Sequence, residues 1–348
     1  MLFRFYFILL SFVVLFCSCS KQDSKKCNID SSLLSISDFP IGVAVDQIYL
    51  NNDSMYRHVF MTQFSSATAE NTFKPAYLHP EENFYYWDEA EQLINICRVN
   101  NMRVHGHTLI WHQQNPQWMV EYKGNREDWE RMMKLHITSI VRYFKPKILS
   151  WDVVNEAFNE DGSLRNTIWL EHIGPSYIEL AYRAAHEANP DAKLFYNDFG
   201  LEMNPTKRKA VINFFNHLKS RGVPIDGIGL QMHVDIKYTE AAMIEDAIRD
   251  VANNHYDVHL SEVDISLNPL GKAYQLTTKD LEAQADLMVK IVRAYKNIPK
   301  HQQFGITFWG VSDQYSWIPS YYNRTDYPLL FDESFNPKPI YCKLKQAL

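Results

Sequence analysis

The chain has 348 residues, of which 46% are hydrophobic and 14% aromatic, so it can bury a large core. Its formal net charge is -6, and its 35 basic and 41 acidic residues are spread along the sequence. Because no Lys/Arg cluster or basic stripe is present, the charge pattern argues against nucleic acid as a partner and suits a neutral ligand. The length allows two domains or one large α/β barrel.

Residues 1–19 are typical of a processing segment. Arg4 precedes an apolar run over residues 5–16, which is too short to span a bilayer comfortably. The Cys-Ser-Cys-Ser sequence that follows resembles the cleavage point of a bacterial lipoprotein signal, with Cys19 as the lipidated residue. Ordinary secretion with cleavage nearby is the alternative. Residues 20–37 are polar and lack helical periodicity, which predicts a tether. We therefore expect an exported protein that touches a membrane only through a lipid anchor at the bacterial cell envelope, or that is otherwise secreted.

Short apolar runs alternate with longer helical patterns from residue 40 onward. The runs predict strands at residues 41–45, 63–67, 103–109, 148–154, 193–196, 227–232, 258–263 and 305–308. The patterns between them predict helices at residues 87–100, 128–144, 177–188, 207–221, 240–253 and 280–296. Asn204 and Pro205 predict an N-cap and a first helical position, and Gly222 predicts the end of the same helix.

Eight strands that alternate with helices predict an α/β fold in which a parallel sheet closes into a (β/α)8 TIM barrel. A doubly wound open sheet is the alternative, and the lack of a GxGxxG sequence after the first strand weakens its nucleotide-binding version. No repeat, low-complexity block or linker interrupts the sequence after residue 40. We therefore expect a single domain over residues 38–348.

Polar and aromatic side chains of binding type follow nearly every predicted strand. In chain order they are Glu70, Asn71, His105, His107, Trp111, Asn155, Glu156, Asn197, Asp198, Gln231, His233, Glu262, Asp264 and Trp309. Core packing does not require such residues there, whereas the chemistry of α/β barrels collects at the carboxyl ends of the strands.

Two glutamates stand out in this set, Glu156 at the end of the fourth strand and Glu262 at the end of the seventh. Hydrolysis of a glycosidic bond needs one carboxyl group as an acid and another as a nucleophile or base. Since the two strands lie across the barrel, the carboxyl groups could approach to about 5 Å, the separation for retention of configuration. A structural ion pair with a barrel arginine is the alternative for Glu262. Asn155 and Glu156 are adjacent, so a regular strand cannot aim both inward, and we expect a local irregularity there.

The sequence His105-Gly-His107 allows a competing interpretation, a zinc site. His233 and His259 could complete such a site, but His259 and Glu262 should point to different faces of their strand. Metal-dependent barrels also usually carry the HxH pair on the first strand, and here it lies on the third. We favour histidines that orient carboxylates or sugar hydroxyls, and therefore expect no metal.

Six segments in order closely resemble glycoside hydrolase family 10, the retaining endo-β-1,4-xylanases, from about residue 41 to the end of the chain. They are Thr-Ala-Glu-Asn-Thr-Phe-Lys from residue 68, Arg-Val-His-Gly-His-Thr-Leu-Ile-Trp-His from 103, Trp-Asp-Val-Val-Asn-Glu-Ala from 151, Gln-Met-His from 231, Ser-Glu-Val-Asp from 261 and Phe-Trp-Gly-Val-Ser-Asp from 308. Phe73, Pro75 and Ser261 depart mildly from the family pattern and occupy no catalytic position.

The resemblance implies roles for individual residues. Glu156 matches the general acid/base and Glu262 the nucleophile, while Asn155, His233 and Asp264 look like catalytic support. The residues that resemble substrate contacts are Glu70, Asn71, Lys74, His107, Trp111, Gln231, Trp309 and Trp317.

The activity that the resemblance implies is retaining endo-hydrolysis of xylan, with xylan or xylo-oligosaccharide as the partner and no metal or organic cofactor. Glu262 must be ionised to attack the anomeric carbon, and Glu156 must hold a proton for the leaving oxygen. Two alternatives stay open. One is a related barrel glycosidase that acts on mannan, cellulose or another β-linked glucan, and the other is a surface glycan-binding protein without turnover.

Overall fold

The computed structural model describes residues 32–271 and 273–348. The predicted signal peptide, Cys19 and most of the predicted tether therefore lie outside the described residues. The folded body begins before the predicted boundary at residue 38, because Leu33–Ser35 form a 3-10 helix and Leu33 is completely buried in the core. Burial of the hydrophobic Leu33 side chain fixes residues 33–35 against the core, although the sequence around them is polar.

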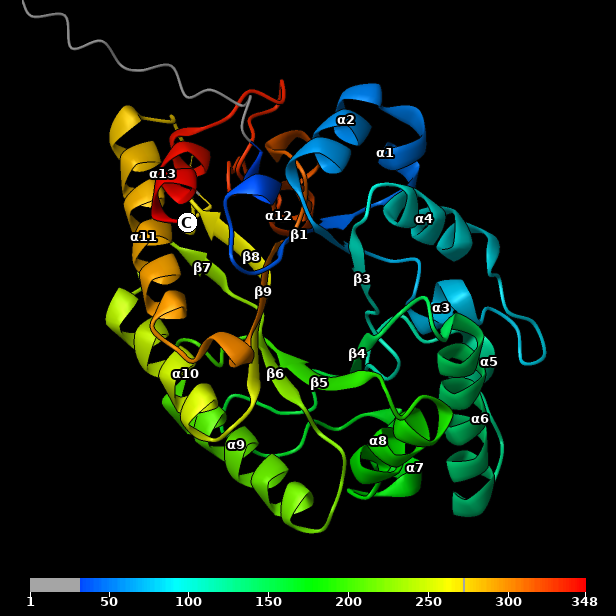
Figure 1. Ribbon diagram of the computed structural model, residues 1–348. Helices are drawn as coiled ribbons and strands as arrows, with labels where there is room; N and C mark the ends of the chain where they lie inside the picture. Colours follow the sequence, from blue (N-terminus) through cyan, green and yellow to red (C-terminus); the bar gives the residue numbers. More distant parts are fainter. Residues whose placement is uncertain (1–31, 272) are drawn as a thin grey trace, which may run out of the picture.

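The strands form one parallel sheet that closes on itself, which confirms the (β/α)8 barrel (Figure 1). The sheet order is β3-β2-β1-β9-β8-β6-β5-β4, and β3 and β4 at its two ends are joined by parallel bridges between Gly106 and Trp151 and between Ile110 and Val154. The bounds are β1 Ile41–Val45, β2 Ser66–Ala69, β3 Arg103–His105, β4 Ser150–Asn155, β5 Lys193–Asp198, β6 Gly227–Leu230, β8 Asp257–Ser266 and β9 Gln303–Phe308. A short strand, β7 (His233–Asp235), continues beyond β6 and also pairs with β8.

Helices surround the barrel, and the six long predicted ones are confirmed as α4 (Asp88–Val99), α6 (Arg126–Phe144), α8 (Tyr177–Ala188), α9 (Pro205–Ser220), α10 (Ala241–Asn253) and α11 (Thr278–Lys296) (Figure 1). The start of α9 is as predicted, since the Asn204 side chain accepts a hydrogen bond from the Lys207 amide and Pro205 opens the helix. No helix among the described residues is both long enough and apolar enough to cross a bilayer.

Shorter helices, which the sequence did not predict, complete the fold: α1 (Gln47–Asn52), α2 (Ser54–Gln63), α3 (Pro75–Leu78), α5 (Gln117–Val120), α7 (Ile168–Ile173), α12 (Trp317–Tyr322) and α13 (Pro339–Ala347). Two predicted strands extend three or more residues outside the observed ones. The predicted strand over residues 63–67 was placed too early, because the Asp53 carboxylate caps α2 and that helix runs through Gln63. The predicted strand over residues 103–109 ends at His105, after which isolated bridges replace regular pairing.

Gly106 lets β3 and β4 close the barrel. A Cβ atom at this position would lie 2.1 Å from the Trp151 ring, so only glycine permits the approach. His105 and His107 flank Gly106 and contact β4 at Ser150 and Asp152.

Candidate active site

The backbone leaves regular strand geometry where β4 ends, as the sequence predicts. The pairing of β4 with β5 shifts register between Asp152 and Val154, and Glu156 has a φ of 56°. The Glu156 amide donates to the Asn197 carbonyl at 2.9 Å, and Arg165 Nε donates to the Glu156 carbonyl at 2.9 Å. This turn lets Asn155 and Glu156, although adjacent, both contribute side chains to one site.

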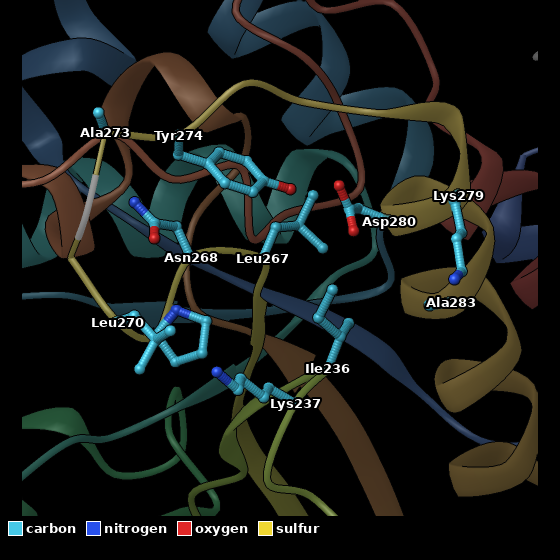
Figure 2. Close-up of a pocket in the computed structure, with 11 residues that line it drawn as sticks. Ile236, Lys237, Leu267, Asn268, Leu270, Ala273, Tyr274, Lys279, Asp280 and Ala283 are labelled. Carbon is cyan, nitrogen blue, oxygen red and sulfur yellow. The ribbon is translucent and has the colours of Figure 1, made fainter.

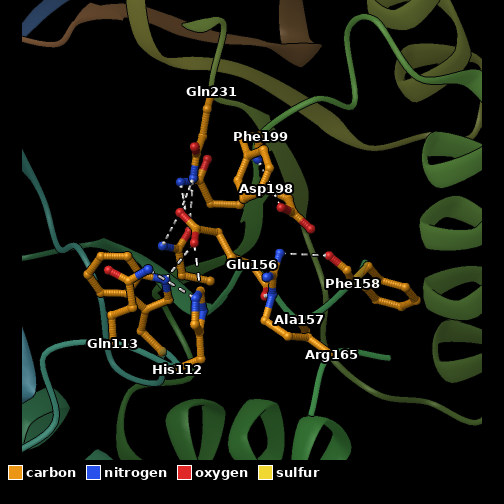
Figure 3. Close-up of polar contacts among 12 residues, drawn as sticks. His112, Gln113, Glu156, Ala157, Phe158, Arg165, Asp198, Phe199 and Gln231 are labelled. Atoms are coloured by element: carbon orange, nitrogen blue, oxygen red, sulfur yellow. Dashed lines mark hydrogen bonds and ion pairs between the residues drawn. The ribbon is translucent and has the colours of Figure 1, made fainter. Parts of the chain in front are cut away.

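The Glu156 carboxyl group receives hydrogen bonds from neutral donors (Figure 3). Trp111 Nε1 donates to Oε2 at 2.8 Å, and Gln231 Nε2 donates to Oε1 at 3.0 Å. The His112 ring places Nδ1 3.7 Å from the same Oε2. The side chain keeps 11% exposure, so the carboxyl group is buried but reachable.

The Glu262 carboxyl group lies on β8 in a more strongly polar environment. Asn197 Nδ2 donates to Oε1 at 2.7 Å, and His233 Nε2 lies 3.1 Å from Oε2. Burial alone would raise the pKa of Glu262, but the hydrogen bond from His233 and the nearby histidines outweigh it and hold that pKa below its usual value. Glu262 is therefore ionised at neutral pH.

His233 bridges two carboxylates. Its Nδ1 lies 2.9 Å from Asp264 Oδ2, and Trp317 Nε1 donates to the same oxygen at 2.9 Å. Burial opposes a charge on the ring, but Asp264 and then Glu262 raise the pKa of His233 well above its usual value. Since both ring nitrogens face carboxylate oxygens, His233 is an imidazolium that donates to each of them.

Three side-chain amides connect the two glutamates. The Asn155 amide contacts the Asn197 amide at 3.0 Å, Glu156 at 3.4 Å and Gln231 at 3.4 Å. Because Asn197 also holds Glu262, a chain of two amides leads from one carboxyl group to the other. The strand-end rule marked Asn197 as a polar residue after the fifth strand, but the sequence gave it no role.

The predicted substrate contacts lie next to this pair. Lys74 Nζ lies 3.3 Å from Asn71 Oδ1 and 4.9 Å from the centre of the Trp111 ring. Burial lowers the pKa of Lys74, and the nearby acidic side chains, Glu262 first, oppose the shift. Burial, together with Asp46, raises the pKa of Glu70 to about 8. The ammonium of Lys74 therefore lies among the carboxyl groups of the site.

The aromatic side of the site is formed by residues that follow β3 and β9. The His107 ring packs edge-on against Trp309 at 5.4 Å, and the Trp309 amide donates to the Val263 carbonyl beside Glu262. Trp317 packs against His233 at 5.1 Å. The structure thus gathers every residue predicted for catalysis or substrate contact at one end of the barrel.

The two histidines of the HxH sequence share one carboxylate. His105 Nε2 lies 3.1 Å from Asp152 Oδ1, and His107 Nδ1 lies 2.9 Å from Asp152 Oδ2. His259 is fully buried and contacts Thr307 Oγ1 at 2.8 Å. Within the ranges that the structure describes, no three His, Cys, Asp or Glu side chains converge as metal ligands would. The orienting interpretation of the pair fits these contacts.

A separate cavity of about 490 Å³ lies beneath the segment that connects β8 to α11 (Figure 2). Its described lining includes Ile236, Leu267, Tyr274 and Lys279 and contains none of the residues predicted for catalysis or substrate contact. The chemistry assembled around Glu156 and Glu262 therefore lies outside this cavity.

A (β/α)8 barrel that holds two buried carboxyl groups at one end, among amide, indole and imidazolium donors, has the architecture of a glycoside hydrolase. The model of glycosyl hydrolase family 10 matches residues 32–347. The chain therefore belongs to glycosyl hydrolase family 10.

Comparison with individual proteins agrees with this assignment. A β-1,4-xylanase of Dictyoglomus thermophilum is 37% identical over 338 residues, which cover 93% of each chain. An endo-1,4-β-xylanase A of Thermoanaerobacterium saccharolyticum is 36% identical over 87% of this chain, which spans only 26% of that relative. Among solved structures, xylanase 10B of Thermotoga petrophila in complex with xylobiose matches this chain with a TM-score of 0.87 at 34% identity. The match covers 91% of this chain and 97% of the Thermotoga chain.

Proposed function

We propose that the protein is a retaining endo-β-1,4-xylanase in which Glu262 is the nucleophile and Glu156 the general acid/base. The observation that carries the assignment is the difference between the two carboxyl environments. Glu262 is bound by the imidazolium of His233, whereas Glu156 is bound by neutral donors from Trp111 and Gln231. A cationic partner favours the ionised form that a nucleophile needs.

The first half of the proposed reaction forms a covalent intermediate. The ionised oxygen of Glu262 attacks the anomeric carbon while the bond to the leaving oxygen breaks, and Glu156 transfers its proton to that oxygen. Lys74, Asn71, Glu70 and His107 bind the sugar upstream of the cut. The shortened chain leaves, and the sugar stays bound to Glu262 as an ester.

The second half releases the sugar. Glu156, now a carboxylate, takes a proton from water, and the oxygen of that water attacks the anomeric carbon and displaces Glu262. Two inversions give net retention. A separation of about 5 Å between the carboxyl groups stays a prediction of this mechanism.

The xylan preference is supported by family membership and by the relatives, which are named as xylanases and include a structure with xylobiose. The test is a panel of xylan, mannan and cellulose. We expect reducing ends to be released from xylan at the highest kcat/KM, with short oligosaccharides as early products of internal cleavage. A strong preference for mannan or cellulose would overturn the substrate assignment. Binding of xylan without release of reducing ends would instead indicate a glycan-binding protein.

Replacement of His233 by Asn should shift the acidic limb of the pH profile. Without the imidazolium, the ionised form of Glu262 loses a charged hydrogen bond, so the pKa of Glu262 rises. Because Glu262 must be ionised to attack, activity should now be lost at a higher pH as the solution is acidified. A charged hydrogen bond contributes about 1.5–3 kcal/mol, which corresponds to about 1–2 pH units.

The measurement is kcat/KM against pH for His233→Asn, with the exposed His217→Asn on α9 as the control. An unchanged acidic limb in His233→Asn would show that the imidazolium does not set the charge of Glu262.

We also propose export with lipidation at Cys19, supported by the apolar run, the cysteine that follows it and the polar residues after that. Fatty-acid labelling of the full chain in a bacterial host, lost in Cys19→Ser, is the expected result. Labelling that survives this substitution would contradict the assignment of Cys19.

A further inference from the structure

The peptide turn that carries Glu156 is held from outside by three hydrogen bonds. Two are those of the Glu156 amide to Asn197 and of Arg165 to the Glu156 carbonyl. In the third, the Ala157 amide donates to the Tyr196 hydroxyl at 3.0 Å. A non-glycine residue at positive φ adopts a conformation that costs free energy, so its surroundings must maintain it.

The Tyr196 hydroxyl is itself fixed by a buried carboxylate. It donates a short hydrogen bond to Asp198 Oδ2, and both residues are completely buried. Asp198 Oδ1 accepts from the Phe199 amide and from Lys207 Nζ, each at 2.9 Å. The hydroxyl hydrogen is thereby directed to Asp198, which leaves the oxygen to accept from Ala157.

Lys207 completes the cluster although its side chain has no exposure. Its ammonium donates to Asp198, to the Phe199 carbonyl at 2.8 Å and to Glu160 at 3.4 Å, and it lies 3.9 Å from the centre of the Phe199 ring. A fully buried ion pair seldom adds net stability over apolar packing. Its presence directly behind the turn points to a need for fixed geometry.

We propose that Tyr196, held in place by Asp198 and Lys207, is a positioning residue for the Glu156 acid/base. The inference rests on the proposed role of Glu156. Figure 3 shows Ala157, Arg165, Asp198 and Phe199 close to Glu156. Removal of the hydroxyl frees the Ala157 amide and lets the turn relax, which moves the carboxyl group away from the leaving oxygen.

The test uses the dependence of the reaction on the leaving group. Xylotetraose needs a proton from Glu156 to expel a sugar hydroxyl, whereas a dinitrophenyl β-xylobioside expels a stable phenolate without it. In Tyr196→Phe we expect kcat/KM for xylotetraose to fall about 30- to 100-fold, because a misplacement of about 1 Å has that effect. The kcat/KM for the aryl glycoside should stay within about twofold.

Tyr182→Phe is the matched control, because Tyr182 is equally buried on α8 and its hydroxyl has no hydrogen-bond partner among the described residues. Tyr182→Phe should leave kcat/KM unchanged for both substrates. Glu156→Ala is measured in parallel. If the loss of kcat/KM in Glu156→Ala does not depend on the leaving group, the proposed function fails. If that loss does depend on the leaving group but Tyr196→Phe lowers kcat/KM equally for both substrates, only the positioning role of Tyr196 is overturned.

A second variant covers a failure of Tyr196→Phe to fold. Asp198→Asn keeps the shape of the side chain but weakens the acceptor that orients the Tyr196 hydroxyl. In Asp198→Asn we expect the same selective fall of kcat/KM for xylotetraose. Azide should also accelerate turnover of the aryl glycoside, because it replaces a misplaced base. An equal fall of kcat/KM for both substrates, without acceleration by azide, would contradict the proposal.

Discussion

Replacement of Glu262 by Ala should reduce the hydrolysis of xylo-oligosaccharides by about 10⁵- to 10⁶-fold, the loss that follows removal of a covalent nucleophile. The neighbouring Asp264 is not free to take over, because its carboxyl group is held by both His233 and Trp317. The measurement is kcat on a dinitrophenyl β-xylobioside, for which no acid is needed, so that only the loss of the nucleophile is observed.

Azide identifies the role of Glu262 through stereochemistry. In Glu262→Ala, azide can occupy the vacated space and attack the anomeric carbon directly, which yields a glycosyl azide of inverted configuration. Glu262→Gln, which fills the space, is the matched control and should not be rescued. A retained product from Glu262→Ala would overturn the assignment of the nucleophile.

Replacement of Glu156 by Ala should produce a loss that depends on the substrate. For xylotetraose we expect kcat/KM to fall about 10²- to 10⁴-fold, because proton donation to the leaving oxygen is lost. For the aryl glycoside, kcat/KM should be little changed while kcat falls, since the intermediate now lacks a base to activate water.

Addition of azide should restore kcat on the aryl glycoside in Glu156→Ala and give a product of retained configuration, because azide attacks the intermediate from the side of the missing carboxyl group. Gln231→Ala, which removes a donor to Glu156 but keeps the carboxyl group, is the comparison and should not be rescued. An inverted azide product from Glu156→Ala would exchange the roles of the two glutamates.

Much of the barrel could be predicted because its signals are local. The apolar face of residues 177–188 and the Asn204-Pro205 start of α9 depend only on neighbouring residues, and α8 and α9 match their predictions closely. The end of β3 depends instead on its pairing with β4, which is distant in sequence and places Trp151 against Gly106. No pattern in the residues around β3 indicates this pairing. β2 begins at Ser66 rather than at residue 63, because α2 runs through Gln63.

The residues of the site could be predicted from the sequence, but the hydrogen bonds between them could not. The strand-end rule located Glu156, Glu262 and Asn197, since it follows from the topology of a parallel barrel. That Asn197 binds Glu262 depends on side-chain directions across three strands, which a sequence does not specify. For the same reason, the shared contact of His105 and His107 with Asp152 was visible only in the structure.

The bridge that His233 makes between Glu262 and Asp264 has a consequence for the catalytic cycle as a whole. In the proposed mechanism Glu262 becomes an ester and ceases to be a counter-ion, and a partly buried imidazolium with no other partner would then be left uncompensated. Asp264 Oδ2 lies 2.9 Å from His233 Nδ1, so His233 keeps a hydrogen-bonded partner both before and after the covalent bond forms. The proposed cycle can therefore change the charge of the site by one unit and restore it without leaving His233 as an isolated buried charge.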